Sequence, residues 1–234
     1  MVLQVQEGLL TTSASTPSSV RILVATAVPA DRDAVARAFT SDTLSAVDVI
    51  AAGVGPAAAA AATATALAGT PYDLVVSAGI AGGFQPEAPV GSLVIADEIT
   101  AADLGAETPD GFVPVTELGF GTVTHRPPSA LVRDLATATG ARTGAVLTVS
   151  TVTGTAARAT ELRARHPRAL AEAMEGFGVA EAAAAHGIPV LELRAVSNPV
   201  GPRDRTAWRI GDALAALTAG FGKCAPVLES WRQV

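Results

Sequence analysis

The stretch Asp73-Leu74-Val75-Val76-Ser77-Ala78-Gly79-Ile80-Ala81-Gly82-Gly83 decides how this chain folds. Its first six residues form an apolar run that predicts a strand covered on both faces. Three glycines follow, and glycine lets the backbone pass close to a ligand. Ligands of α/β proteins bind outside the carboxyl ends of such strands. The stretch therefore predicts a buried strand ending in a ligand-binding turn, with a purely structural glycine turn as the alternative.

Comparable apolar runs lie on both sides and alternate with longer segments rich in alanine and leucine. Further strands are expected at residues 21–27, 47–52, 91–95, 145–149 and 189–197. Helices are expected at residues 30–39, 56–68, 129–139, 156–165, 175–186 and 207–221. Strands separated by helices imply crossover connections and a largely parallel sheet. We expect one α/β domain over residues 20–234, a central twisted mixed sheet flanked by helices, after a flexible tail at residues 1–19.

The composition argues against several classes of function. Of the 234 residues, 49% are hydrophobic and 16% charged, which is typical of a globular chain. The net charge of −6 argues against a nucleic acid or an anionic membrane as partner, because both require a basic surface. The single cysteine, Cys224, excludes an internal disulfide and is expected to be buried. No signal peptide, membrane span or metal-ligand spacing is recognisable, so we expect a cytoplasmic protein without metal or cofactor.

The segment from Asp103 to Phe120 interrupts the alternation of strands and helices. It is rich in glycine and proline and carries two phenylalanines, Phe112 and Phe120. Excursions of this length are often functional.

Two motifs near the C-terminus carry polar side chains at element boundaries. Met174-Glu175-Gly176 opens the helix expected at 175–186, where a glutamate either complements the helix dipole or serves a binding site. Arg194-Ala195-Val196-Ser197-Asn198 ends a strand. Asn198 is either a turn residue or a side chain that donates and accepts hydrogen bonds at a base edge.

The order of these motifs resembles the superfamily of purine nucleoside phosphorylases and methylthioadenosine nucleosidases. The resemblance extends from Arg21 to Phe221 and includes the strand–helix turn Gly53-Val54-Gly55-Pro56. Further details resemble the futalosine hydrolases within this superfamily: Ala27-Val28-Pro29-Ala30-Asp31-Arg32, Ala102-Asp103-Leu104-Gly105-Ala106-Glu107 and Asn198-Pro199-Val200-Gly201-Pro202-Arg203-Asp204. The resemblance implies release of hypoxanthine from futalosine in an alternative menaquinone pathway, by a homo-oligomer whose sites lie near a subunit boundary.

Phosphorylases of the superfamily hold phosphate with an arginine and a Ser or Thr around the strand-end glycine. The matching positions here are Ser77 and Ile80. Serine lacks the bidentate fork of arginine, and isoleucine offers no donor, so a bound phosphate would lose its hydration without compensation. Water is therefore the expected nucleophile, although Arg32, near the place of a third phosphate-binding arginine, keeps a phosphorylase as an alternative.

The resemblance also assigns roles to individual residues. Glu175 would bind the ribose hydroxyls and favour an oxocarbenium-like transition state, and Asp31 would position and activate water unless it only complements a helix N-terminus. Asn198 stands where adenine-specific relatives have aspartate, and its NH2 suits O6 or N7 of hypoxanthine. It would stabilise the departing base by a hydrogen bond, with Asp204 as an alternative acid.

The remaining candidate substrate contacts come from the same motifs and from aromatic residues. Phe84, Phe112 and Phe120 are candidates for the 5′ side, where futalosine carries an aromatic carboxylate. They fall in segments that could contribute a lid or a contact from a neighbouring subunit, although each could be a core residue instead. The other predicted contacts are Gly82, Met174 and Ser197. Two further alternatives are a methylthioadenosine or S-adenosylhomocysteine nucleosidase, which Asn198 disfavours, and a nucleoside-binding protein without catalysis.

Overall fold

The computed structural model describes residues 20–39 and 47–231, in which helices and strands alternate except for one run of five consecutive strands. The predicted tail at residues 1–19 lies outside these ranges. The elements are β1 (Ile22–Thr26), α1 (Pro29–Ala36), β2 (Val47–Ala51), α2 (Pro56–Gly69), β3 (Leu74–Gly83), β4 (Leu93–Ala101), β5 (Gly105–Thr108), β6 (Gly111–Pro114), β7 (Thr124–His125), α3 (Ser129–Thr139), β8 (Arg142–Thr148), α4 (Ala156–Arg165), β9 (Ala169–Ala173), α5 (Gly176–Ala185), β10 (Val190–Pro199), the 3-10 turn η2 (Arg205–Ala207) and α6 (Ile210–Ser230).

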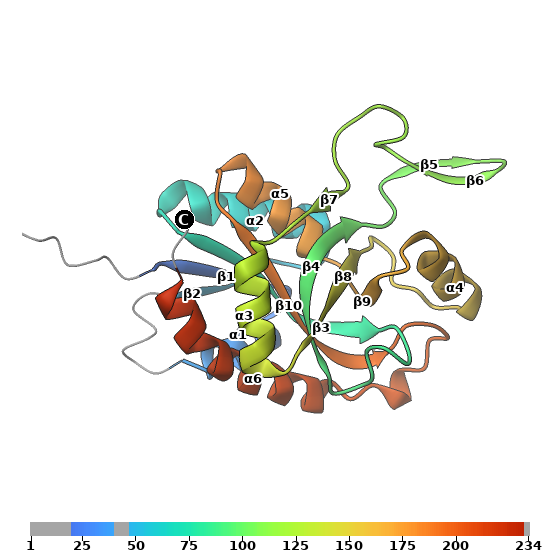
Figure 1. Cartoon of the computed structure of the whole chain (residues 1–234). Coiled ribbons are helices and arrows are strands. Elements are labelled where there is room, and N and C mark those ends of the chain that lie inside the picture. The colour runs from blue at the N-terminus through green and yellow to red at the C-terminus, as the bar shows by residue number, and fades with distance from the viewer. Residues whose placement is uncertain (1–19, 40–46, 232–234) are drawn as a thin grey trace, which may run out of the picture.

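The central sheet is mixed and closes on itself. Its strand order is β10-β4-β8-β9-β3-β1-β2, and β10 also pairs with β3. The strands β10, β4, β8, β9 and β3 therefore form a ring, in which β10–β4 and β3–β9 are the antiparallel pairs. Parallel β1 and β2 extend the sheet beyond β3 (Figure 1). The expected α/β domain with a central mixed sheet is confirmed.

Helices cover both sides of this sheet. Helices α1, α3 and α6 pack on one side, in a core cluster that includes Leu131, Leu217 and Phe221. Helices α2 and α5 pack on the other side (Figure 1). Cys224 lies in the first cluster as predicted, and burial raises the pKa of its thiol to about 12.

The second helical layer depends on one very close approach. A Cβ added to Gly178 of α5 would lie 2.0 Å from the carbonyl oxygen of Pro56, the first residue of α2. Only a glycine at position 178 allows the two helices to approach so closely. The predicted start of α2 at Pro56 is confirmed, and the left-handed Gly187 follows the end of α5.

The glycine-rich stretch that follows Ala78 is strand, not the turn that the sequence predicts. β3 continues through Gly79 and Gly82 to Gly83 because β10 and β9 pair with these residues. A Cβ on Gly79 would lie 2.9 Å from Nη1 of Arg194, and one on Gly83 would lie 2.1 Å from the carbonyl oxygen of Ala88. The glycines thus admit neighbouring groups to the strand instead of reversing the chain.

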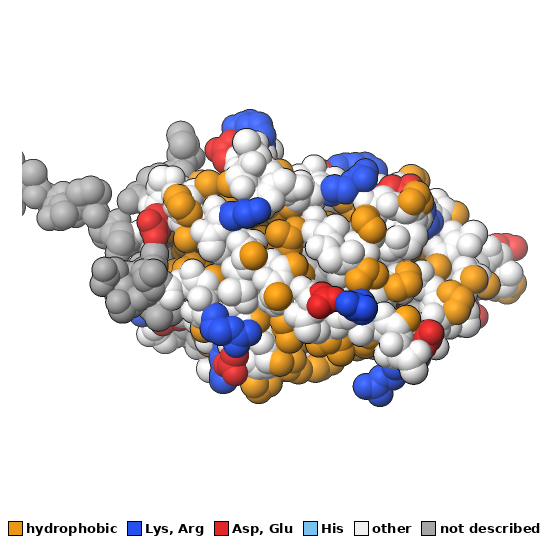
Figure 2. All heavy atoms as spheres, turned by 90° about the horizontal axis from the view of Figure 1, so that it is seen from below, with side chains coloured by type: hydrophobic (Ala, Val, Ile, Leu, Met, Phe, Trp, Pro, Cys, Tyr) orange, Lys and Arg blue, Asp and Glu red, His pale blue; other side chains and the backbone are white. Residues whose placement is uncertain are grey.

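All six predicted helices are present, and α6 begins three residues later and ends nine residues later than predicted (Ile210–Ser230 against 207–221). The sequence failed to predict β9 and the hairpin β5–β6, which projects from the domain within the excursion (Figure 1). None of the helices in the described ranges combines the length and apolar character that a membrane span requires. On the face drawn in Figure 2, basic side chains are scattered and several adjoin acidic ones, without a continuous basic patch.

Candidate active site

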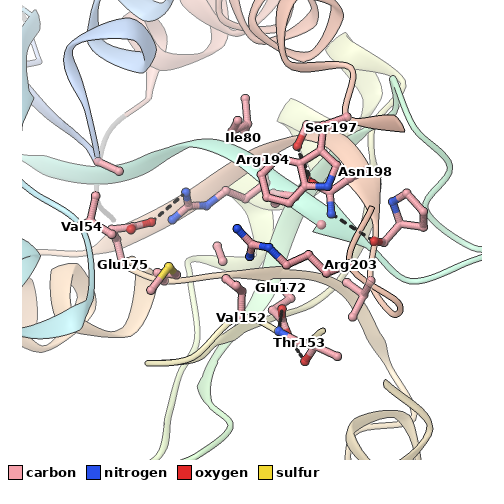
Figure 3. A pocket seen from close by; sticks show the side chains of 18 of the residues that line it. Val54, Ile80, Val152, Thr153, Glu172, Glu175, Arg194, Ser197, Asn198 and Arg203 are labelled. Atoms are coloured by element: carbon pink, nitrogen blue, oxygen red, sulfur yellow. Dashed lines mark hydrogen bonds and ion pairs between the residues drawn. The ribbon is translucent and has the colours of Figure 1, made fainter. Parts of the chain in front are cut away.

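A pocket of about 370 Å³ is lined by residues of β3, β9 and β10 and by the segments that follow β1 and β9. Its lining includes six residues that the sequence predicts as site residues, and these come from four separate segments of the chain (Figure 3). They are Asp31, Gly82, Met174, Glu175, Ser197 and Asn198. The fold therefore brings most of the predicted site together.

Arg194 organises one end of this pocket. Its guanidinium donates from Nη1 to Oε2 of Glu175 at 3.3 Å, from Nε to Oε1 of Glu192 at 2.8 Å, and from Nη2 to Oγ of Ser77 at 3.0 Å. Arg194 and Glu192 are almost completely buried. Alternation along β10 places residues 192 and 194 on the same face, and opposite charge makes the burial of both tolerable.

Glu175 is held from two sides. It is the N-cap residue of α5, but its side chain caps no helical N–H. Oε1 instead accepts a hydrogen bond from the backbone N–H of Gly55 at 3.2 Å, while Oε2 faces Arg194. Between its two predicted roles, the contacts favour a carboxylate positioned in a binding site over a helix cap.

Asp31 completes a group of three buried carboxyls around one guanidinium. It lies in the first turn of α1 and is only 4% exposed. Burial raises its pKa above the ordinary value of 3.8, against the lowering effect of Arg194, and the charge of Glu175 raises it further. Burial likewise raises the pKa of Glu192, whose Oε2 has no hydrogen-bond partner among the described residues. Because one arginine faces three carboxyls, protonation of one of these carboxyls is favoured at this end of the pocket.

Ser197 and Asn198 define another part of the pocket. Ser197 Oγ donates to Oδ1 of Asn198 at 2.8 Å, and Nδ2 of Asn198 donates to the carbonyl oxygen of Pro199 at 3.0 Å. The oxygen of the amide is thereby engaged within the protein. One N–H of Nδ2 remains to donate to a ligand, since an amide nitrogen carries two hydrogens.

Glu172 and Thr153 border the pocket and were not predicted. Glu172 accepts from the backbone N–H of Thr153 at 2.8 Å and from its hydroxyl at 2.5 Å (Figure 3). Its side chain is buried, and desolvation raises its pKa despite the two hydrogen bonds from Thr153 that lower it.

Arg203 and Trp208 lie in the pocket lining on the loop after β10. The guanidinium carbon of Arg203 is 5.4 Å from the centre of the Trp208 ring. Among the described residues, no carboxylate forms an ion pair with Arg203, in contrast to Arg194.

Asp204 lies outside the pocket lining, so the structure gives no support to its prediction as an alternative acid. Its carboxylate is exposed and caps η2, where Oδ1 accepts from the backbone N–H and the hydroxyl of Thr206. These hydrogen bonds lower its pKa, which is the wrong direction for a proton donor.

The three phenylalanines also lie outside the pocket lining. Phe84 is 1% exposed and packs in the core with Leu147 and Leu162. Phe112 lies on β6 under the guanidinium of Arg165, at 4.4 Å, and Phe120 is 66% exposed. Packing and the outward hairpin keep these rings away from the pocket of the same copy, so their contact with substrate through a lid or a neighbouring subunit stays a prediction.

The positions that bind phosphate in phosphorylases carry side chains here that do not suit phosphate binding. Ser77 accepts from Arg194, and Ile80 presents an apolar side chain to the pocket. Arg32, which kept the phosphorylase alternative open, points away to Asp33 at 2.7 Å and is not part of the lining. Among the described residues, no cluster of His, Cys, Asp or Glu is arranged to hold a metal ion.

Known proteins resemble the chain over nearly its whole length. The model of the phosphorylase superfamily matches residues 19–223. The futalosine hydrolase of Streptomyces coelicolor is 73% identical in a match of 229 residues that covers 90% of this chain and 97% of that protein. This chain belongs to the futalosine hydrolase family. The futalosine hydrolase of Acidothermus cellulolyticus is 46% identical and covers 87% of this chain and 89% of its own length.

Solved structures support the fold of the family. The native futalosine hydrolase of Helicobacter pylori matches with a TM-score of 0.76 at 15% identity, over 89% of this chain and 98% of that one. A methylthioadenosine/S-adenosylhomocysteine nucleosidase from Colwellia psychrerythraea, in complex with adenine, matches with a TM-score of 0.74 at 22% identity, over 91% and 94%.

Several pocket residues of this futalosine hydrolase family member were missed at the sequence level. Those in the lining are Arg194, Glu172, Thr153, Arg203 and Trp208, and Glu192 lies outside the lining as the ion-pair partner of Arg194. A signal existed for two of them, because Glu192 and Arg194 alternate with leucines in an otherwise apolar strand, and buried charges are rarely found unpaired. No comparable signal marked Thr153 or Glu172.

Proposed function

We propose that this protein hydrolyses the N-glycosidic bond of futalosine and releases hypoxanthine and dehypoxanthinyl futalosine. The observation that carries the proposal is the pairing of two buried carboxyls, Asp31 and Glu175, with an amide, Asn198, in one pocket. The carboxyls suit a cationic sugar, and the amide suits a 6-oxopurine. The 73% identity to the futalosine hydrolase of Streptomyces coelicolor supports the same substrate.

Glu175 binds the 2′- and 3′-hydroxyls of the ribose in this proposal. As the glycosidic bond breaks, positive charge develops on the sugar, and the fixed carboxylate stabilises it more than the neutral ground state. The N–H of Gly55 and the guanidinium of Arg194 hold this carboxylate in place before substrate arrives. Little reorganisation is then needed during the reaction.

Asp31 takes a proton from the attacking water in its ionised form. Its raised pKa makes it a stronger base than an ordinary aspartate, because a higher pKa brings the group nearer to neutral pH. Asn198 donates its remaining N–H to O6 or N7 of the departing base. An amide has no useful acidity, so the base leaves as an anion that Asn198 stabilises by hydrogen bonding, and it becomes neutral hypoxanthine by taking a proton from solvent.

Water is favoured over phosphate as the nucleophile. The guanidinium of Arg194 is already engaged by Glu175, Glu192 and Ser77, and the carboxyls beside it repel an anion. This arrangement supports a hydrolase and disfavours the phosphorylase alternative.

Other parts of the proposal concern the setting of the enzyme. Arg203 and Trp208 offer a cation and an aromatic surface to the aromatic carboxylate on the 5′ side of futalosine. We further propose a homo-oligomer, in which hydrophobic residues of the excursion such as Phe120 can face a neighbouring copy, and a cytoplasmic role in menaquinone synthesis.

One assay tests the proposed reaction. The protein is incubated with futalosine, inosine and methylthioadenosine, with and without phosphate, and the released base is identified. We expect hypoxanthine from futalosine at equal rates in both buffers and little adenine from methylthioadenosine. A sugar 1-phosphate product would establish a phosphorylase, and binding without turnover would establish a nucleoside-binding protein.

A further inference from the structure

Glu172 is a buried carboxyl in the pocket for which the proposed reaction has no use. It lies on β9, away from the group of Asp31, Glu175 and Arg194, and borders the pocket beside Thr153 (Figure 3). A buried carboxyl is costly unless it is hydrogen-bonded. Thr153 supplies two hydrogen bonds, one to each oxygen. Each oxygen keeps a free lone pair, because an ionised carboxylate has about four acceptor sites.

The sheet places Glu172 on the same side as the amide of Asn198. Glu172 is paired with Gly82 in the antiparallel register of β9 and β3. Side chains of directly paired residues project from the same face of a sheet. A Cβ in the position that Gly82 leaves empty would be 3.4 Å from Nδ2 of Asn198. The carboxyl of Glu172 and the free N–H of Asn198 therefore border the same part of the pocket, next to Gly82, where Cγ2 of Val200 packs 2.9 Å from the same Cβ position.

The two groups form a complementary pair of one donor and one acceptor. A 6-oxopurine presents an acceptor, O6, next to a donor, N1–H, on its six-membered ring. Adenine presents the opposite pattern, a 6-amino donor next to the lone pair of N1. An amide N–H and a carboxylate match the first pattern and oppose the second at both positions.

We propose that Glu172 accepts the N1–H of the purine and, together with Asn198, determines specificity for 6-oxopurines. This inference rests on the proposed function, since it identifies the residues that bind the purine base in the same pocket. Thr153 acts as a positioning residue, because its N–H and hydroxyl hold the carboxylate. Glu172 takes no part in bond cleavage.

Binding of free bases tests the inference without catalysis. Hypoxanthine, 1-methylhypoxanthine and adenine are titrated into the protein and into Glu172→Gln, and the dissociation constants are compared. 1-Methylhypoxanthine keeps O6 but has no N1–H. We expect Glu172→Gln to weaken hypoxanthine binding by roughly 10- to 100-fold, the range for a hydrogen bond to a charged group. Binding of 1-methylhypoxanthine should change little, so the ratio of its dissociation constant to that of hypoxanthine should fall towards one.

Two further variants make the result decisive. Glu161→Gln carries the same chemical change on a half-exposed carboxylate of α4 outside the pocket lining, and should leave the ratio unchanged. Glu172→Asp keeps the charge but retracts it by one methylene, and should lower the ratio even if Glu172→Gln fails to fold. A structural role of Glu172 would weaken both bases equally. Equal losses, or an unchanged ratio in a folded variant, would overturn the inference.

Cleavage of futalosine by the unaltered protein separates this inference from the function on which it rests. If futalosine is not cleaved, the proposed function is wrong whatever the ratio of base affinities. If futalosine is cleaved and the ratio does not depend on Glu172, the function stands and the role of Glu172 is wrong.

Discussion

Arg194 and Glu175 form an ion pair of 3.3 Å in which the side chains are 1% and 7% exposed. Removing one partner of such a pair leaves the other charge buried and uncompensated, which is more costly than losing an exposed salt bridge. The pair therefore has two effects, since it stabilises the fold locally and sets the position of the carboxylate that we propose faces the sugar.

Glu175→Gln should lose at least ~100-fold in kcat/KM on futalosine, equivalent to about 3 kcal/mol. The amide preserves the shape of the side chain but removes the charge that stabilises the developing cation. Initial rates over a range of futalosine concentrations measure the effect, with the melting temperature as a control for folding. A variant with activity close to that of the unaltered protein would show that the carboxylate only supports the helix.

Asp31→Asn should be nearly inactive and yet more stable than the unaltered protein at neutral pH. The pKa of Asp31 is raised in the folded state, so the folded protein binds this proton more tightly than the unfolded chain. Its contribution to stability is therefore fully present below the unfolded pKa of about 4 and is lost as pH rises through the folded pKa. Asparagine does not titrate and avoids this loss.

Melting temperatures of both proteins between pH 4 and pH 8 measure the difference. We expect the advantage of Asp31→Asn to grow with pH and to be absent at the acidic end. On the same reasoning, kcat/KM of the unaltered protein should fall on acidification at a pH above the ordinary aspartate range. A variant that is less stable at every pH would contradict the pKa direction.

Asn198→Asp should reverse the preference between bases. The volume is almost unchanged, so the effect is chemical: an ionised carboxylate would face the lone pairs of O6. Activity on futalosine should fall, while activity on its adenine analogue should rise relative to it. The ratio of kcat/KM on the two substrates isolates transition-state discrimination. If that ratio stays the same, Asn198 does not contact position 6.

Arg203→Gln should raise KM for futalosine and leave inosine almost unaffected. Arg203 lines the pocket without a carboxylate partner among the described residues, and only futalosine brings an anionic group to it. Arg205→Gln, the neighbouring arginine near Trp208 but outside the pocket lining, is the matched control. An equal effect on both substrates would place the aromatic carboxylate elsewhere.

Phe84→Ala should destabilise the protein by about 3–5 kcal/mol, the usual cost of truncating a buried phenylalanine. Phe120→Ala should cost little stability in the isolated chain, because its ring is 66% exposed. Thermal unfolding of the two variants measures the contrast. A large loss for Phe120→Ala would indicate that its ring is buried by a second copy of the chain.

The sequence predicts the elements that have strong local signals. α3 was found at its observed bounds because Pro127 and Pro128 precede it and Gly140, which is left-handed, ends it. β9 was missed because Ala169–Ala173 reads as a helical segment, and only its pairing with β8 and β3 makes it a strand.

The residues of the site likewise divide into those with a local sequence signal and those placed by contacts between distant segments. Glu175 and Asn198 sit in recognisable motifs, and Asp31 aligns with the acidic residue that activates water in related nucleosidases. The position of Glu172 in the pocket depends on the pairing of β9 with β3, two strands far apart in the sequence, and the local sequence pattern does not encode that pairing. Asp204 caps η2 outside the pocket lining, and the sequence does not distinguish an acidic residue in a site from one that caps a short turn.

The contact between Gly178 and Pro56 has a consequence for engineering this protein. The alanine-rich interface of α2 and α5 invites larger side chains as a route to thermal stability, but any side chain at position 178 would push α2 outward. Gly55, immediately before Pro56, donates the N–H that holds Glu175. A library of core substitutions should therefore contain variants that fold well but bind ribose poorly. Substitutions at position 178 are the ones in which we first expect stability and activity to change independently.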